Sequence, residues 1–271
     1  MYAYRAYIES ILNYSRDALD THLSAGLFYR DTEAHLENTA LDGDNEGFKK
    51  RASFVAGSRQ FDLLGHVHSD LFFQDKLLAH AEALQLSNAK YAIERVALKI
   101  FSIPAGTRLT QQQNLFLGQL PKLIIIGFVD NTAFSGLYNS NPFNFKHYDI
   151  NYAALVHEGA VIPAKPFTPN FGTSNFVREY LGLVSITGKQ LRDSGVVVSR
   201  EGYAAGYTLF AFDLMPDMEE GDHYNLIKNG NLKAEIRFTQ ALATNVNMVV
   251  FSVFDSVIQV NHARQLMFDY H

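Results

Sequence analysis

Leu115–Tyr152 reads LFLGQLPKLIIIGFVDNTAFSGLYNSNPFNFKHYDINY, and this stretch decides the fold. Within it, Leu123–Val129 is apolar on both faces, which is typical of a central strand in a packed sheet. Turn residues flank this strand, and a loop dense in Asn, Phe and Tyr follows. A second strand is expected to start near Tyr148. The stretch therefore predicts the opening of a β-barrel or sandwich.

Short apolar segments separated by turn signals continue through residues 89–271. Leu232–Phe238 has the clearest pattern, because its apolar residues alternate with Lys233, Glu235 and Arg237 as in a half-buried strand. Phe176–Ile186 fits a strand or a helix, and the prolines at 142, 163, 166 and 169 predict an extended loop. The other expected strands are Tyr91–Ile103, Gln119–Val129, Asp149–His157, Ala160–Ile162, Tyr207–Leu214, Val246–Phe254, Ser256–Val260 and Gln265–Tyr270. About eight strands at this spacing predict a mainly all-β, antiparallel jelly-roll sandwich.

Residues 1–88 have a different texture. Residues 4–19 carry apolar side chains at a helical period, and residues 31–48 are polar and predict a long exposed loop. Phe61–Phe73 predicts one or two strands, and Gln74–Leu86 predicts a helix that leads into the main domain. We expect residues 89–271 to form a complete jelly roll that folds by itself.

The composition of the chain disfavours several classes of function. The chain has 271 residues, 47% of them hydrophobic, with 21 Phe, 14 Tyr and no Trp, which suits a β-rich protein with extensive interfaces. A net charge of -5 disfavours direct nucleic-acid binding. The chain has no cysteine and no apolar run near the ~20 residues that span a bilayer. No signal peptide is visible in MYAYRAYIES, so we expect an intracellular, non-secreted protein.

Two clusters of possible metal ligands depart from the patterns of known metal sites. His66, His68 and Asp70 could share one face of a strand, as in a cupin-like metal enzyme, but Leu71–Phe73 stand where a glutamate ligand is wanted. Acidic residues surround Pro216, without the spacing of a calcium-binding EF-hand loop. They are Asp213, Asp217, Glu219, Glu220 and Asp222. Phosphate-binding loops and nucleophile elbows are missing, so we expect no catalytic residue, cofactor or metal.

Ordered blocks of sequence resemble the major capsid proteins of Maverick/Polinton elements and adintoviruses. They include LFLGQLPK, GFVDNTAFSG and NPFNFKHYDINY in the stretch quoted above. Further blocks are Ile103–Gly106, Ser199–Glu201, GYTLFAFDLMPD at 206–217 and Phe251–Val260, with YRAYIESILNY and GHVHSDLFFQDKLL nearer the N-terminus. The similarity covers essentially all of 89–271.

The resemblance implies a hexon-like double jelly roll. In that family two barrels share one chain, three chains form a pseudo-hexameric capsomer, and capsomers tile the virion capsid, with minor capsid proteins as possible partners. This chain departs from the family because it starts at the YRAYIE-like segment and passes directly from Leu78 into Ala79. Residues 1–88 therefore predict an incomplete first jelly roll, which either a decayed endogenous viral element or an incomplete gene model would produce.

The expected function is structural and non-enzymatic, through self-association into a homotrimer. Interface energy concentrates in aromatic residues, so the loop at 139–148 is the predicted contact. Its candidate residues are Asn141, Phe143, Phe145, His147 and Tyr148. The alternative for the two phenylalanines is that they cap their own barrel. A lectin-like sandwich that binds sugar through Tyr and Asn side chains is the alternative function.

Overall fold

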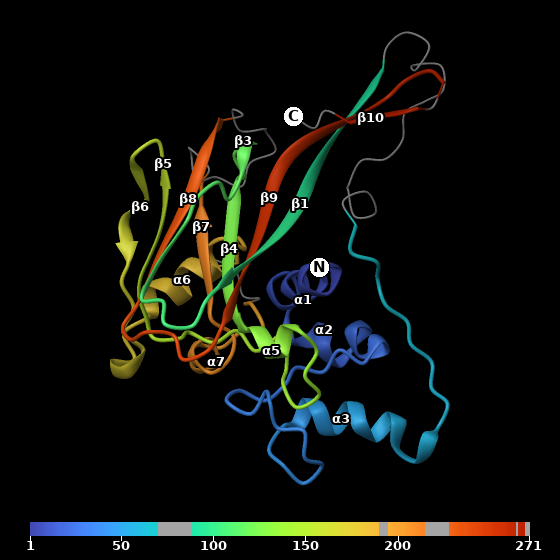
Figure 1. Cartoon of the computed structure of the whole chain (residues 1–271). Helices are drawn as coiled ribbons and strands as arrows, with labels where there is room; N and C mark the ends of the chain where they lie inside the picture. Colours follow the sequence, from blue (N-terminus) through green and yellow to red (C-terminus); the bar gives the residue numbers. More distant parts are fainter. Residues whose placement is uncertain (70–87, 190–194, 215–227, 264, 269–271) are drawn as a thin grey trace.

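Ten strands form two packed antiparallel sheets in the computed structural model (Figure 1), which describes residues 1–69, 88–189, 195–214, 228–263 and 265–268. The first sheet has the order β1-β9-β4-β7, and β10 also pairs with β9. The second has the order β2-β8-β5-β6, and β3 also pairs with β8. Their bounds are β1 Ala89–Ile103, β2 Leu109–Gln112, β3 Leu117–Gln119, β4 Leu123–Asp130, β5 Ile150–His157, β6 Ala160–Phe167, β7 Leu209–Asp213, β8 Asn229–Phe238, β9 Val246–Val260 and β10 Leu266–Phe268. The predicted mainly β sandwich of jelly-roll type is confirmed.

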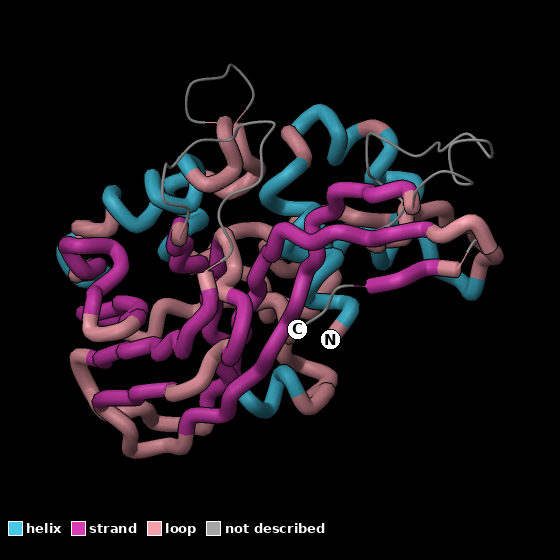
Figure 2. The backbone as a smooth tube through the Cα atoms, turned by 90° about the horizontal axis from the view of Figure 1, so that it is seen from above, coloured by secondary structure: helices cyan, strands magenta, loops and turns pink. Residues whose placement is uncertain are grey.

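Helices are short and gather at one side of the sandwich (Figures 1 and 2). The longest is α1, Tyr2–Asn13. The others described are α2 Arg16–Asp20, η1 His22–Gly26, α3 Glu46–Val55, η2 Ala56–Ser58, α5 Asn131–Phe134, η3 Phe171–Thr173, α6 Val177–Ser185 and α7 Arg200–Ala204. None of the helices in this part of the chain is long and apolar enough to cross a bilayer.

The first sheet has a hydrophobic core on each of its faces. Ile124, Ile126 and Phe128 of β4 point into the space between the two sheets, where they meet β8 side chains such as Ile236. The opposite face of β4 carries Ile125 and Val129, which pack in a second cluster with α1. β4 is therefore a central strand buried on both faces, as its sequence predicts.

Side chains alternate between the two faces of the first sheet along β7, and along β8 they follow the predicted pattern. Phe210 and Phe212 of β7 point between the sheets, whereas Leu209 and Ala211 belong to the outer cluster. In β8 the four apolar positions from Leu232 to Phe238 are buried in the core between the sheets. The alternation of side chains between the two faces of a strand is thus confirmed in β8 and is also present in β7.

The β5–β6 hairpin closes at Glu158 and Gly159, between the two predicted strands. Glu158 and Gly159 have φ of 48° and 84°, the left-handed conformations that a two-residue hairpin turn needs. The expected proline-rich loop is partly wrong here, because Pro163 and Pro166 belong to β6. Among the described strands β6 pairs only with β5, and an edge strand tolerates residues that lack an N–H.

In the first half of the N-terminal segment the helix prediction is confirmed. α1 buries Tyr4, Ile8, Ile11 and Leu12 against the outer face of the first sheet. The segment at 31–48 is irregular up to Asn45, as predicted, but only part of it is exposed, since Asp31, Leu36 and Asn45 are buried. Its last residues start α3, where the Asn45 side chain accepts a hydrogen bond from the Phe48 N–H (3.2 Å).

Of the two predictions for residues 61–86, the structure contradicts one for the residues it describes, and the other falls on residues that it does not describe. The strand prediction is wrong for residues 61–69, which form no sheet pairing and lie exposed up to Val67. The helix predicted at Gln74–Leu86 lies outside the described residues. Residues 1–69 contain helices and loops and, as far as this part is described, no strand. The origin of residues 1–88 in a first jelly roll stays a prediction.

Candidate functional site

The loop between β4 and β5 contains the five predicted contact residues, and it starts at a capped turn. The Asp130 carboxylate accepts hydrogen bonds from the Thr132 N–H (2.8 Å) and hydroxyl (2.6 Å), which begins α5. Gly136 ends that turn with φ of 93°, a left-handed conformation that glycine adopts without strain. The chain then projects outward through Leu137 and Tyr138 before it returns to the body.

Phe145 is fully buried within its own chain. Its N–H donates to the Gly206 carbonyl (2.8 Å), and its carbonyl accepts from the Thr208 N–H (3.0 Å), so the backbone is fixed beside β7. Gly127 of β4 lies directly beneath the ring, since a Cβ there would lie 2.5 Å from the Phe145 Cδ1 atom. The absence of a side chain at Gly127 makes the space that this phenyl ring fills.

Phe143 packs on α1. Its ring is stacked on Tyr7, with centroids 4.4 Å apart and an interplanar angle of 15°. It also meets the Tyr4 ring edge-on at 5.4 Å. Such pairs contribute about 0.5–1.5 kcal/mol beyond their buried area. The aromatic residues of the loop and of α1 therefore form one cluster, although more than a hundred residues separate them in sequence.

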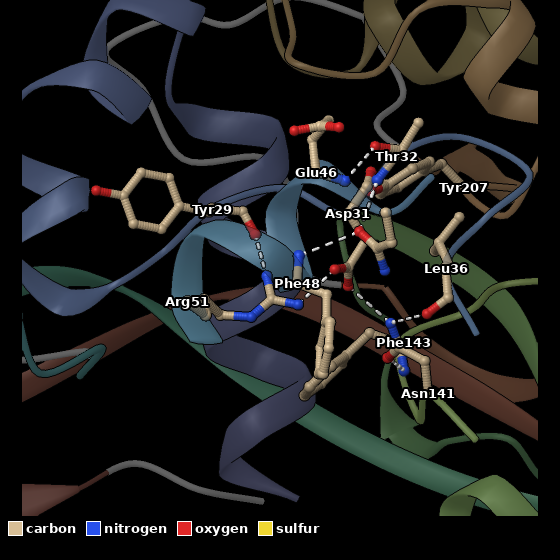
Figure 3. A network of polar contacts seen from close by, with 11 residues as sticks. Tyr29, Asp31, Thr32, Leu36, Glu46, Phe48, Arg51, Asn141, Phe143 and Tyr207 are labelled. Atoms are coloured by element: carbon tan, nitrogen blue, oxygen red, sulfur yellow. Dashed lines mark hydrogen bonds and ion pairs between the residues drawn. The ribbon is translucent and has the colours of Figure 1, made fainter. Parts of the chain in front are cut away.

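Asn141 ties the loop to the segment that follows α1 (Figure 3). Its amide donates to the Asp31 carboxylate (2.8 Å) and to the Leu36 carbonyl (3.2 Å). Its side-chain oxygen accepts from the Phe143 N–H (2.9 Å), so the same residue fixes the loop's own turn. Asp31 is 8% exposed, which makes its hydrogen bonds stronger than those at a wet surface.

The other partners of Asp31 extend this network to α3 and to Tyr207, which lies just before β7 (Figure 3). The Arg51 guanidinium pairs with the Asp31 carboxylate and also donates to the Tyr29 carbonyl. The Tyr207 hydroxyl donates to the Asp31 backbone carbonyl (2.8 Å). A buried carboxylate that is paired and hydrogen-bonded in this way holds several segments in one geometry.

His147 and Tyr148 close the loop near the start of β5. The His147 ring stacks on Phe171 at 4.2 Å, and burial lowers its pKa against the opposing charge of Asp149. Tyr148 and Asp149 both have positive φ, 45° and 49°. Burial, with the charges of Asp130 and Glu37, raises the pKa of Tyr148. Two successive non-glycine residues in this conformation make the turn strained.

The five predicted residues thus lie together, and their described contacts are within the chain. Phe143 and Phe145 cover their own barrel together with α1, which was the alternative for these residues. A role between chains stays a prediction for all five. Sequence reasoning missed the residues that the loop does expose, Phe134, Leu137 and Tyr138, the last of them 89% exposed. The Ser135-Gly136 turn, which lies between Phe134 and Leu137, is the signal that this part of the loop projects.

The metal-site alternative finds different partners for its histidines. The His68 ring lies 2.5 Å from the Glu9 carboxylate (Nδ1 to Oε2), whereas the His66 ring meets His22 edge-on at 6.4 Å between centroids. Asp70 and residues 217–222 of the acidic loop lie outside the described residues, and Asp213 ends β7. Within the described ranges no three His, Cys, Asp or Glu side chains are grouped to hold a metal ion.

The chain was compared with protein-family models, with known protein sequences and with solved structures. No protein-family model matches the chain. A Caenorhabditis elegans protein, the uncharacterized protein F54H12.2, is 22% identical over 99% of this chain and 75% of its own length. Among solved structures, the capsid of the virus PBCV-1 has a TM-score of 0.42 at 11% identity, covering 68% of this chain and 52% of that one.

Two further solved structures are similar. A chain of the Sputnik virophage has a TM-score of 0.40 at 13% identity, covering 66% of this chain and 38% of that one. The mavirus major capsid protein has a TM-score of 0.35 at 10% identity, covering 67% and 41%. This chain thus spans about half the length of these viral chains or less. At such identities their assembly and partners do not transfer to it.

Proposed function

We propose that the chain is a non-enzymatic structural protein that self-associates, derived from a major capsid protein of the Maverick/Polinton and adintovirus type. The observation that carries the proposal is spatial. Three of the blocks that resemble that family, GFVDNTAFSG, GYTLFAFDLMPD and Phe251–Val260, include parts of β4, β7 and β9, which are neighbours in the first sheet. Segments far apart in sequence that build one continuous sheet support common ancestry of the whole barrel more strongly than any single block.

The proposed location is a virion capsid or a capsid-like shell, with the protein intracellular before assembly. Its proposed partners are copies of itself, as a trimer, and a minor capsid protein. The proposed origin of residues 1–88 in a first jelly roll rests on YRAYIESILNY and GHVHSDLFFQDKLL. In this chain the first of these segments forms most of α1 and buries its apolar face on the outer face of the first sheet.

The proposed contact between copies is the loop from Phe134 to Tyr148. Asn141, Phe143 and Phe145 hold the loop in shape, and Leu137 and Tyr138 supply the exposed apolar area. An exposed tyrosine beside an apolar neighbour, on a loop with a fixed base, has the properties of an interface anchor. The buried phenylalanines then act on assembly through the position of the exposed pair.

Light scattering behind a sizing column tests the proposal. A stable trimer or larger oligomer of the whole chain is expected, and a well-folded monomer at all concentrations refutes self-association. Leu137→Ala with Tyr138→Ala should dissociate the oligomer without lowering the melting temperature. The matched control is Leu41→Ala, at another exposed leucine on a loop of the N-terminal segment. A monomer would make sugar binding the function to test next, with a glycan array.

A further inference from the structure

Residues 59–68, which we call the strap, form an extended and exposed segment at the edge of the molecule (Figure 1). From Arg59 to Ser69 the backbone contains neither a turn nor a bend. Leu63 is 57% exposed and Leu64 77%, and Phe61 and Val67 are also exposed. A run of four large apolar side chains in an extended, unpaired segment is what sheet edges recruit.

The strap is anchored at both ends. The Arg59 guanidinium donates to the Ser53 and Ala56 carbonyls (3.0 and 3.1 Å), which fixes the strap to the end of α3. At the other end, the His68 ring lies against the Glu9 carboxylate of α1. The strap therefore holds a defined position on the molecule.

Only one edge of the strap is in use where its hydrogen bonds are described. The Leu64 N–H donates to the Ala25 carbonyl (3.0 Å), and the His68 N–H donates to the Tyr2 hydroxyl (2.8 Å). These residues are four apart, and in an extended chain the N–H groups of alternate residues point to the same side. The backbone N–H and C=O groups of the even-numbered residues thus point toward the body of the molecule. The N–H and C=O groups of odd-numbered residues 61–67 face outward.

We propose that the strap pairs antiparallel with the strap of a second copy, with Leu64 on the two-fold axis. This register uses the outward groups of Phe61, Leu63, Gly65 and Val67 as hydrogen-bonded pairs. It also places Phe61 opposite Val67 of the other copy, and Asp62 opposite His66. Aromatic with β-branched and acidic with basic are the favourable cross-strand pairs.

The neighbouring register with Leu63 on the axis loses this complementarity. With Leu63 on the axis, Phe61 is opposite Gly65 and Asp62 is opposite Leu64, so neither favourable pair forms. The Leu64 register is also self-complementary, as an isologous two-fold contact requires. A two-stranded ribbon is marginal in water on its own, so the contact is expected to count among copies that are already held close. In this respect the inference rests on the proposed self-association.

Cysteine trapping tests the register, because the natural chain has no cysteine. Residues facing each other across a non-hydrogen-bonded antiparallel pair have Cα atoms about 4.5 Å apart, within the range that a disulfide spans. Full-length Leu64→Cys should therefore form a disulfide-linked homodimer under mild oxidation about tenfold faster than Leu41→Cys, whose side chain is similarly exposed (69%). Equal rates for the two variants would overturn the proposal.

A second variant separates the strap from overall assembly. Leu63→Pro in the Leu64→Cys background removes an outward N–H, so the crosslinking rate should fall to that of Leu41→Cys. Light scattering should still show any oligomer that forms through the 134–148 loop. Persistence of fast crosslinking with Leu63→Pro would overturn the strap pairing. If Leu64→Cys without the proline crosslinks fast but light scattering shows nothing larger than a dimer, the capsid-like function is refuted and the strap contact stands.

Discussion

Replacing Phe145 with alanine decides whether this residue stabilises its own chain or joins chains together. The ring is fully buried between Gly127, Leu209 and Tyr4. Removal of a buried phenylalanine costs about 3–5 kcal/mol, from lost transfer free energy and the cavity that remains. At about 2–4 °C per kcal/mol for a domain of this size, the melting temperature should fall by about 6–20 °C.

The assay is thermal and urea unfolding followed by circular dichroism, with the mass measured by light scattering below the transition. Phe143→Ala should cost less, about 1–3 kcal/mol, because its ring is half-buried and its main loss is the stack on Tyr7. Leu41→Ala is the control and should lie within about 0.5 kcal/mol of the natural chain, since its side chain is exposed. An unchanged melt for Phe145→Ala together with loss of the oligomer would refute the intrachain assignment.

Three other changes follow from the same structure. A chain of residues 89–271 alone should aggregate or lose its cooperative melt, because Ile125, Val129 and Phe251 lose their cover from α1; a cooperative melt would show that the barrel stands alone, as the sequence predicts. Asn141→Asp should destabilise the fold increasingly above about pH 4, where two carboxylates would face each other across the present 2.8 Å contact, whereas Asn141→Ala should show no such pH dependence in urea melts. Burial raises the pKa of the Glu179 carboxyl, against its backbone hydrogen bonds and the charge of Arg178. A raised folded-state pKa means that stability is present below the unfolded pKa and lost as pH rises through the folded one, so Glu179→Gln should flatten that fall in unfolding free energy measured from pH 4 to pH 7.

Strand predictions succeeded where the local pattern and the pairing partner agree. The apolar run of β4 and the alternation of β8 describe faces that the sheets do bury. Phe61–Val67 carries a comparable apolar pattern, yet it forms no strand in the described structure. Alternation reports which side chains can share a face, but not whether a sheet edge lies within reach. That information is in the tertiary arrangement and was absent from the local sequence.

In the candidate site, too, some features were predictable from local sequence and others depended on the tertiary arrangement. An Asn-, Phe- and Tyr-rich loop was predictable, and so was its need to bury aromatic rings. Which surface buries them was not, because Phe143 meets Tyr7, far away in sequence. The buried Asp31 was equally hidden, since the polar segment around it reads as solvated loop, whereas Arg51, Asn141 and Tyr207 reach it from three distant places. Local composition carries no sign of such a meeting point.

The N-terminal segment determines which surfaces remain for contacts between copies. β4 is apolar on both faces, so the outer face of the first sheet needs a cover, and α1 supplies it with Ile8 and Ile11. A second chain that docked on this face would have to displace α1 and break the Asp31 network as well. Displacement of several buried apolar residues costs more than a typical exposed contact returns. Association of intact copies should therefore proceed through surfaces that lie outside this cover, and the tip at Leu137 and Tyr138 and the outward edge of the strap are both such surfaces.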